Sequence, residues 1–104
     1  MSERMVLNDD LNLEDRRLLM ERASQAVERI APRGTTHLTL DCSQVETVEG
    51  PMLGTLAVIA RNARRHGIRV ELDMPSVRVR QDIIRAGLRP MFDWSATTDD
   101  TQRR

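Results

Sequence analysis

Lysine is absent from this 104-residue chain, and all 16 of its basic residues are arginine. Without lysine the chain cannot form a Schiff base, build a P-loop or complete a phospho-receiver pocket, because each of these needs a lysine amine. Histidine and cysteine are also scarce, at two residues and one, and they show no metal-ligand spacing. The composition excludes several classes of enzyme, and it predicts no metal site and no cofactor.

Aromatic residues make up only 2% of the chain, which leaves no stacking platform for single-stranded nucleic acid. Sixteen acidic residues balance the arginines, so no net charge draws the chain to nucleic acid or an anionic membrane. The longest uncharged stretch, residues 50–60, is about half of the roughly 20 residues that span a bilayer. We therefore expect no nucleic-acid binding and no direct membrane insertion. The single cysteine and the lack of a leader pattern favour a cytoplasmic location.

Apolar residues recur with the period of strands and helices in alternation along the chain. The pattern predicts strands over residues 5–7, 36–40 and 68–73. It predicts helices over 13–31, from Gly50 to a stop at Gly67, and from a Ser76 cap to a stop at Gly87. A last apolar cluster, near Phe92 and Trp94, is expected to pack back on the core. This order predicts one α/β domain over residues 1–94, with a mostly parallel or mixed sheet, and a mobile tail over 95–104.

A resemblance to the STAS family (sulfate transporter and anti-sigma factor antagonist domains) is carried by residues 40–54, LDCSQVETVEGPMLG. Residues 60–72 and 84–88 are similar to the helix, glycine, strand and helix end that follow in that family. The resemblance covers most of residues 5–94 and implies a STAS-like mixed sheet of about four strands with helices packed on it. Only four residues precede Met5, so the first strand is expected to be reduced or missing. Such an exposed sheet edge favours a homodimer or a strand-sharing partner.

The resemblance also implies a function, that of a non-enzymatic regulatory domain similar to an anti-sigma factor antagonist. Such a domain binds a protein partner, here an anti-sigma factor kinase-like protein. One alternative is the accessory subunit of a membrane lipid-transport ATPase, whose partner is an ATPase subunit, and another is a stress-sensing scaffold subunit. In phospho-regulated members the phosphoacceptor occupies the position of Gly50, which has no hydroxyl, so no phosphorylation switch is expected there. The predicted partner-binding residues are Ser43, Thr47, Glu49, Gly50, Pro51, Met52, Thr55 and Leu56.

Three aspartates offer the nearest approach to a catalytic centre. Asp9, Asp10 and Asp41 imitate the acidic pocket of a phospho-receiver, but the chain has no lysine to complete it. Asp41 is explained more simply as a strand-end residue that accepts hydrogen bonds from loop amides. Cys42 is expected to be a core residue and His37 a structural one. The sequence thus points to protein partners and away from catalysis.

Overall fold

The computed structural model describes residues 2–7, 13–48 and 50–94. Its elements in chain order are β1 (Ser2–Val6), α1 (Leu13–Ile30), η1 (Ala31–Arg33), β2 (His37–Asp41), α2 (Gly50–Arg65), β3 (Arg69–Asp73), α3 (Val77–Arg85), η2 (Arg89–Met91) and β4 (Phe92–Trp94), where η marks a short 3₁₀ turn. The predicted α/β alternation is confirmed. The mobile tail predicted over 95–104 lies outside the described residues.

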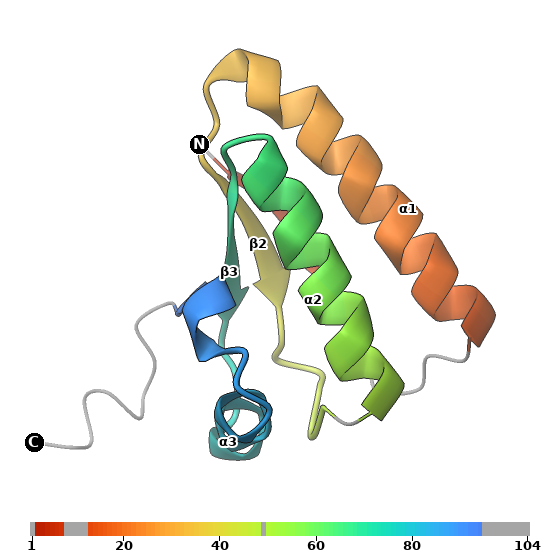
Figure 1. Cartoon of the computed structure of the whole chain (residues 1–104), viewed down its shortest axis with the longest axis vertical. Coiled ribbons are helices and arrows are strands. Elements are labelled where there is room, and N and C mark those ends of the chain that lie inside the picture. The colour runs from red at the N-terminus through yellow and green to blue at the C-terminus, as the bar shows by residue number, and fades with distance from the viewer. Residues whose placement is uncertain (1, 8–12, 49, 95–104) are drawn as a thin grey trace, which may run out of the picture.

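The four strands form one sheet in the order β1-β2-β3-β4, which is also their order in the chain. All three pairings are parallel, so the sheet is wholly parallel over the described residues. The register places Met5 beside Leu40, Leu40 beside Leu72, and Leu72 beside Trp94. Figure 1 shows α1 and α2 side by side in front of the strands, with α3 seen end-on below them. The α3 helix and the loop before α2 therefore lie at the carboxyl ends of the strands.

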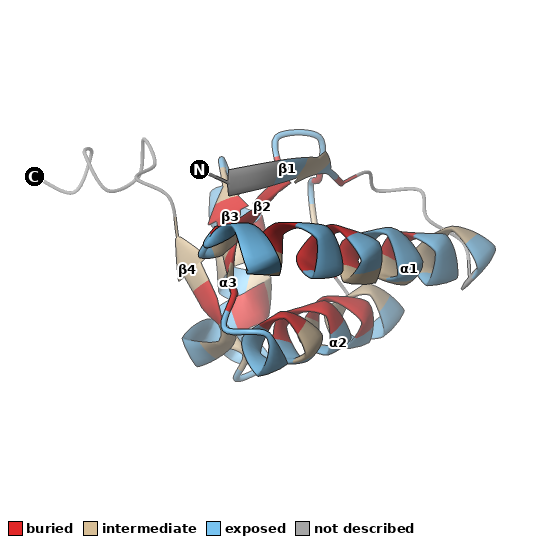
Figure 2. Cartoon of the chain, turned by 90° about the horizontal axis from the view of Figure 1, so that it is seen from above, coloured by how far each residue is buried: buried red, intermediate tan, exposed pale blue. Residues whose placement is uncertain are grey.

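The core fills the space between the sheet and the helices. Every second strand residue points toward α1 and α2, as the two-residue period of a strand requires. In Figure 2 the buried residues lie on the inner surfaces of the helices and strands. The largest fully buried side chains are Leu7, Leu38, Leu40, Leu56, Ile68, Leu72, Ile83, Val27, Val70, Val79 and Cys42.

Polar side chains occupy the opposite face of the sheet, which none of the described helices covers (Figure 2). Arg4 on β1 crosses this face and forms ion pairs with Asp41 at 3.1 Å and with Asp73 at 2.7 Å. Thr39 donates a hydrogen bond to Glu71 at 3.2 Å. These contacts link β1, β2 and β3, and they suit a face that stays in contact with water.

The helix boundaries follow local signals in the sequence. Acidic residues in the first turn of α1 favour the positive end of the helix dipole. The Ser76 side chain accepts a hydrogen bond from the Val79 amide, so the predicted cap of α3 is confirmed. Gly67 has a positive φ of 75°, the left-handed conformation expected of a residue that ends a helix.

Two strand predictions need correction. β1 begins at Ser2 and not at Met5, although it is short, at five residues. The cluster near Phe92 and Trp94 packs on the core, as predicted, but it also forms β4 beside β3, a strand that the sequence pattern did not predict. A three-residue strand with Asp93 at its centre has no detectable period of its own. The segment becomes a strand because Phe92 and Trp94 pair with Val70 and Leu72 of β3.

Candidate functional site

The loop between β2 and α2 is held at its start by the end of β2. One carboxylate oxygen of Asp41 accepts a hydrogen bond from the Ser43 amide at 2.9 Å. Hydrogen bonds from Ser43 hold the pKa of Asp41 below its ordinary value. The Cys42 amide donates to the Asp73 carbonyl at 2.8 Å, which extends the pairing with β3 by one residue. Asp41 is thus a structural residue that bonds a loop amide, as the sequence predicted.

Asp82 on α3 fixes the end of the same loop. One of its carboxylate oxygens accepts hydrogen bonds from the Thr47 hydroxyl at 2.7 Å and from the Val48 amide at 2.9 Å. The side chain of Asp82 is only 10% exposed. The Val48 amide, and after it the Thr47 hydroxyl, lowers the pKa of Asp82 below its ordinary value. An ionised carboxylate therefore joins the loop before α2 to α3.

No local pattern in the sequence predicts this role for Asp82. The periodicity of α3 predicts Val79, Ile83 and Ala86 as inward residues; Val79 and Ile83 are fully buried, but Ala86, at the helix end, is exposed. Asp82 lies between Val79 and Ile83 at a position that reads as an ordinary polar residue. An acidic residue next to the buried stripe of a short helix is the signal that could have drawn attention to it, because such a carboxylate needs donors from another element.

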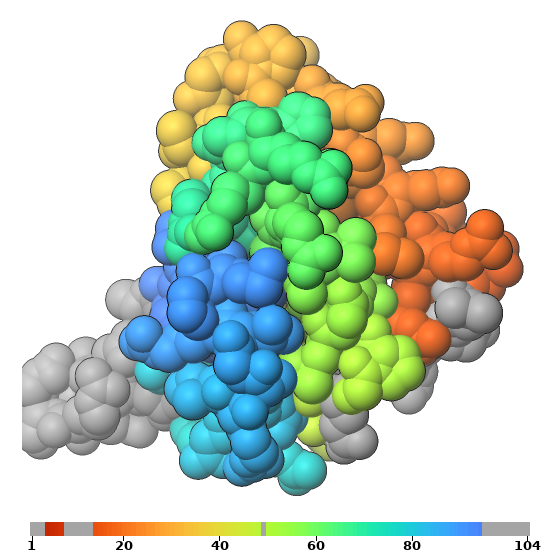
Figure 3. Space-filling model, in the orientation of Figure 1, coloured from red at the N-terminus to blue at the C-terminus, as the bar shows by residue number. Residues whose placement is uncertain are grey.

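The predicted partner-binding residues divide into an exposed group and a buried group. Ser43, Gly50 and Pro51 are exposed, while Thr47 and Met52 are partly buried. We call these five residues the α2 entry surface. Gly50 has a positive φ of 41°, which a glycine adopts without strain. Figure 3 shows the start of α2 and α3 as adjoining parts of one molecular surface.

The other three predicted residues do not add to that exposed surface. Thr55 and Leu56 are buried, with exposures of 6% and 1%. The Thr55 hydroxyl donates to the Pro51 carbonyl at 3.0 Å, so it stabilises the first turn of α2 from within. Thr55 and Leu56 therefore lie beneath the α2 entry surface and are not accessible to a partner. Glu49 lies outside the described residues.

Exposed apolar side chains accompany this end of the molecule. Met74, in the turn before α3, is 59% exposed, and on α3 itself Val77 and Ile84 are 51% and 48% exposed. Single exposed apolar residues are common on protein surfaces. On α3 the exposed Val77 and Ile84 lie on the side of the helix opposite Asp82, and so they face away from the loop before α2.

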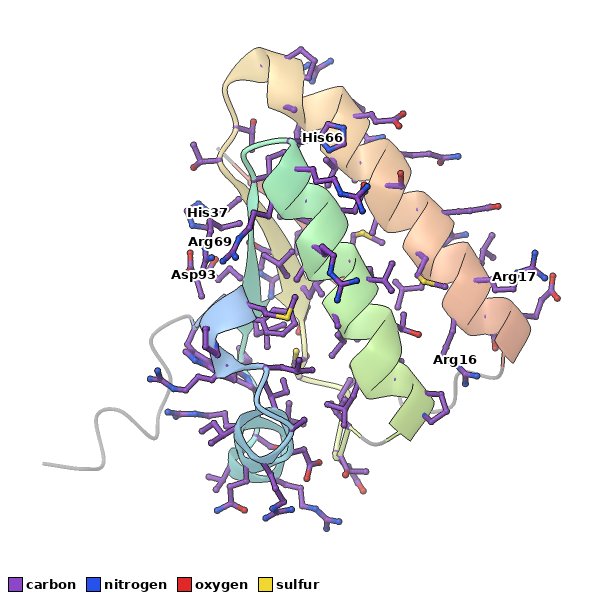
Figure 4. The ribbon with its side chains drawn as sticks, in the orientation of Figure 1. Arg16, Arg17, His37, His66, Arg69 and Asp93 are labelled. Atoms are coloured by element: carbon purple, nitrogen blue, oxygen red, sulfur yellow. The ribbon has the colours of Figure 1, made fainter. Side chains whose placement is uncertain are left out.

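The remaining chemical candidates have structural roles. Cys42 is 2% exposed, and burial raises the pKa of its thiol to about 12, so at neutral pH it is a protonated core residue. His37 lies on the helix-free face within 2.9 Å of Asp93, and Arg69 binds the other oxygen of Asp93 at 2.7 Å (Figure 4). The Arg69 guanidinium, with His37 second, holds the pKa of Asp93 below its ordinary value. This cluster fastens β4 to β2 and β3.

Side chains able to bind a metal ion do not gather in the described part of the chain. No group of three or more histidine, cysteine or acidic side chains in residues 2–7, 13–48 and 50–94 could hold a metal ion. The receiver-like pocket cannot be judged whole, because Asp9 and Asp10 lie outside those ranges. Its third member, Asp41, is bound by Arg4. No helix in the same ranges is long and apolar enough to cross a membrane.

Comparison with known proteins agrees with this architecture. The NMR structure of the protein TM1081 superposes with a TM-score of 0.72 at 19% identity, covering 97% of this chain and 78% of that one. A crystal structure of TM1081 from Thermotoga maritima, named as a proposed anti-sigma factor antagonist, gives 0.67 at 20% identity, covering 96% and 85%. None of the curated proteins compared with the chain matches it. The family model described as the STAS domain of Mlab matches residues 2–92, and the chain therefore belongs to the STAS domain family.

Proposed function

We propose that this protein is a non-enzymatic regulatory domain that binds a protein partner through the α2 entry surface, as an anti-sigma factor antagonist does. The observation that carries the proposal is the pair of hydrogen bonds from Thr47 and Val48 to Asp82. They fix Thr47 and Val48, in the loop before α2, against α3, so this part of the loop has a defined position before any partner arrives. A preformed surface loses little conformational entropy on binding.

The chemistry of this surface suits a protein partner better than a small substrate. It combines an exposed proline, a partly buried methionine and a glycine whose lack of a side chain allows close approach. Among the described residues, one cavity lies beside α1 and β1 and another between α1 and α2. An exposed glycine and proline beside a partly buried methionine form a surface that another protein can cover.

The proposal includes a difference from phospho-regulated members of the family. Gly50, at the position that carries their acceptor, has no hydroxyl to receive a phosphate. Partner binding is then independent of phosphorylation at this position, and the protein is either constitutively active or a scaffold regulated through its abundance. The match to TM1081 supports the antagonist role through the fold and the name of that protein.

Affinity capture with a matched pair of variants tests the proposal. The tagged chain is used to recover partners from its own cells, which are identified by mass spectrometry. Gly50→Asp places a negative charge on the surface, whereas Gly50→Asn has nearly the same shape and the same positive φ without the charge. We expect Gly50→Asp to reduce partner recovery about tenfold, which corresponds to a loss of about 1.4 kcal/mol, and Gly50→Asn to retain it. Equal recovery with both variants would show that the partner binds elsewhere.

The identity of the captured protein decides between the candidate pathways. An anti-sigma factor kinase-like protein supports the antagonist role. The ATPase subunit of a membrane lipid transporter would instead make this chain its accessory subunit. Recovery of large assemblies of the chain with related domains would indicate a stress-sensing scaffold.

A further inference from the structure

Two neighbouring helices form an exposed surface in front of the sheet. α1 and α2 lie side by side there (Figure 1), and they run in the same direction because each links two adjacent parallel strands. Figure 3 shows both helices at this surface of the molecule. Each helix contributes a stripe spaced four, three and four residues apart, which keeps the stripe on one side of the helix. The stripes, which we together call the helix face, are Arg17, Glu21, Ser24 and Glu28 of α1 and Gly54, Val58, Arg61 and Arg65 of α2.

The two stripes lie beside each other at the same height. All of their residues are exposed apart from Ser24, which is partly buried. A cavity of about 230 Å³ between the helices is lined by Met20 and Ser24 from α1 and by residues within 58–65 from α2. The middle of each lined segment marks the same height along the two helices. Glu21 of α1 is therefore about level with Arg61 of α2.

The two stripes carry opposite charges that do not meet within one chain. α2 contains no acidic residue, so Arg61 and Arg65 have no carboxylate on their own helix. Glu28 follows Glu21 by about 10.5 Å of helix and Arg65 follows Arg61 by about 6 Å, a difference that an arginine side chain can span. In the part of the chain that the structure describes, none of these four side chains forms an ion pair.

This distribution of charge favours a second copy of the chain over an unrelated partner. A two-fold rotation about an axis parallel to the helices keeps every residue at its height and places α1 of one copy opposite α2 of the other. Glu21 of each copy then faces Arg61 of the other, and Glu28 faces Arg65. With the axis across the helices, α2 would face α2 and the arginines would have no carboxylate opposite them. A purely acidic helix would meet the two glutamates with like charge.

We propose that a second copy of this chain binds to the helix face, in an isologous contact about an axis parallel to α1 and α2. Val58 is 46% exposed and borders the cavity between the helices, so it lies next to the axis. The two copies of Val58 therefore meet and cover each other. Gly54 is exposed and has no side chain, which lets the opposite α1 approach closely.

The dimer goes beyond the proposed function because it uses a different part of α2. Gly50 and Pro51, in the α2 entry surface, lie at the start of the helix, before the residues of the contact. The open edge of β1 takes no part either. Because the axis runs along the helices, both α2 entry surfaces lie at the same end of the dimer.

A mixture of two charge variants tests the proposed pairs. Glu21→Arg and Arg61→Glu each replace two attractive pairs in the dimer by two repulsive ones, so each alone should raise the dimer dissociation constant about tenfold. An equimolar mixture of the two variants forms a heterodimer in which both pairs are attractive again, and it should recover the wild-type dissociation constant. Arg22→Glu, an exposed change on the side of α1 that borders β1, is the matched control and should leave the constant unchanged. Mass is measured by analytical ultracentrifugation over a range of concentrations.

A cysteine at the axis tests the geometry. Val58→Cys places two thiols next to each other in the dimer, so oxidised glutathione should link the chains through a disulfide. Leu18→Cys is the matched control, because Leu18 is 47% exposed but lies on the side of α1 that borders β1. Cys42 is buried, so the introduced cysteine is the accessible thiol.

Three results would overturn the proposal. They are a monomer at the highest soluble concentration, a mixture of the folded charge variants that shows no recovery, and equal cross-linking of the two cysteine variants. Circular dichroism shows whether each variant is folded. Partner recovery with Gly50→Asp is a separate measurement, so failure of the dimer leaves the proposed function standing.

Discussion

Asp82→Ala is expected to be the most informative single change in this protein. It removes the acceptor of two hydrogen bonds and leaves the amide of Val48, a residue only 2% exposed, without its partner. Hydrogen bonds to charged groups contribute about 1.5–3 kcal/mol, and an orphaned buried amide costs a similar amount. The two contributions overlap, so we expect the free energy of unfolding to fall by about 2–4 kcal/mol, which for a domain of this size lowers Tm by roughly 10–20 °C.

Related variants separate the charge of Asp82 from its shape. Asp82→Asn keeps one acceptor oxygen for the Val48 amide and should lose about half as much stability. The ion pair with Arg85 adds little, because the atoms are 3.8 Å apart and the Arg85 side chain is 73% exposed. Gln81→Ala, an exposed change on the same helix, is the control and should alter stability by less than about 0.5 kcal/mol.

The assay is urea denaturation followed by the fluorescence of Trp94, the sole tryptophan, and by far-UV circular dichroism. A double-mutant cycle with Thr47→Val should give a coupling energy of about 1 kcal/mol between Thr47 and Asp82. Additive effects, within about 0.3 kcal/mol, would refute the reasoning because the hydroxyl and the carboxylate would then not interact.

The pH dependence of stability gives an independent check on the same group. The folded pKa of Asp82 lies below its ordinary value of 3.8, so the unfolded chain binds more protons in acid. The contribution of Asp82 is therefore complete above about pH 4 and is lost as the pH falls through the folded pKa. The difference in stability between wild type and Asp82→Asn should shrink in that acid range. A constant difference down to the lowest pH would contradict the assigned charge.

Three further predictions concern the cap of α3, the two faces of α3 and the buried Cys42. Ser76→Ala removes the cap of α3 and should cost about 1 kcal/mol by urea denaturation, whereas a loss below about 0.3 kcal/mol would show that the cap is dispensable. Ile83→Ala, at a fully buried position, should cost about 2–5 kcal/mol, while Ile84→Ala, at a half-exposed one, should cost far less; equal losses would contradict the assigned faces. Cys42 should resist alkylation in the native protein at neutral pH and react after unfolding, and rapid native labelling would contradict its burial.

The sequence predicted the parts of the fold that local patterns determine. The stripes of α1 and α2, the Ser76 cap and the alternation of residues 68–73 depend on neighbours along the chain, and the structure confirms them except at Leu18 of the α1 stripe, which is 47% exposed. β4 depends on pairing with β3 across more than twenty residues, which no local pattern records. The apolar period of α2 places Leu56 on its inward face, where it is buried, whereas the anchor at Asp82 depends on a contact 34 residues away.

The order of the strands also bears on how the protein is made. Each strand pairs with the strand that precedes it in the chain, and a helix connects each pair. During synthesis the unit from β1 to β2 can form before β3 leaves the ribosome, and each later strand adds to an edge that already exists. No strand has to insert between two others. At each stage the strand made last lies at one edge of the sheet, where the next strand can pair with it. β1 stays at the opposite edge throughout.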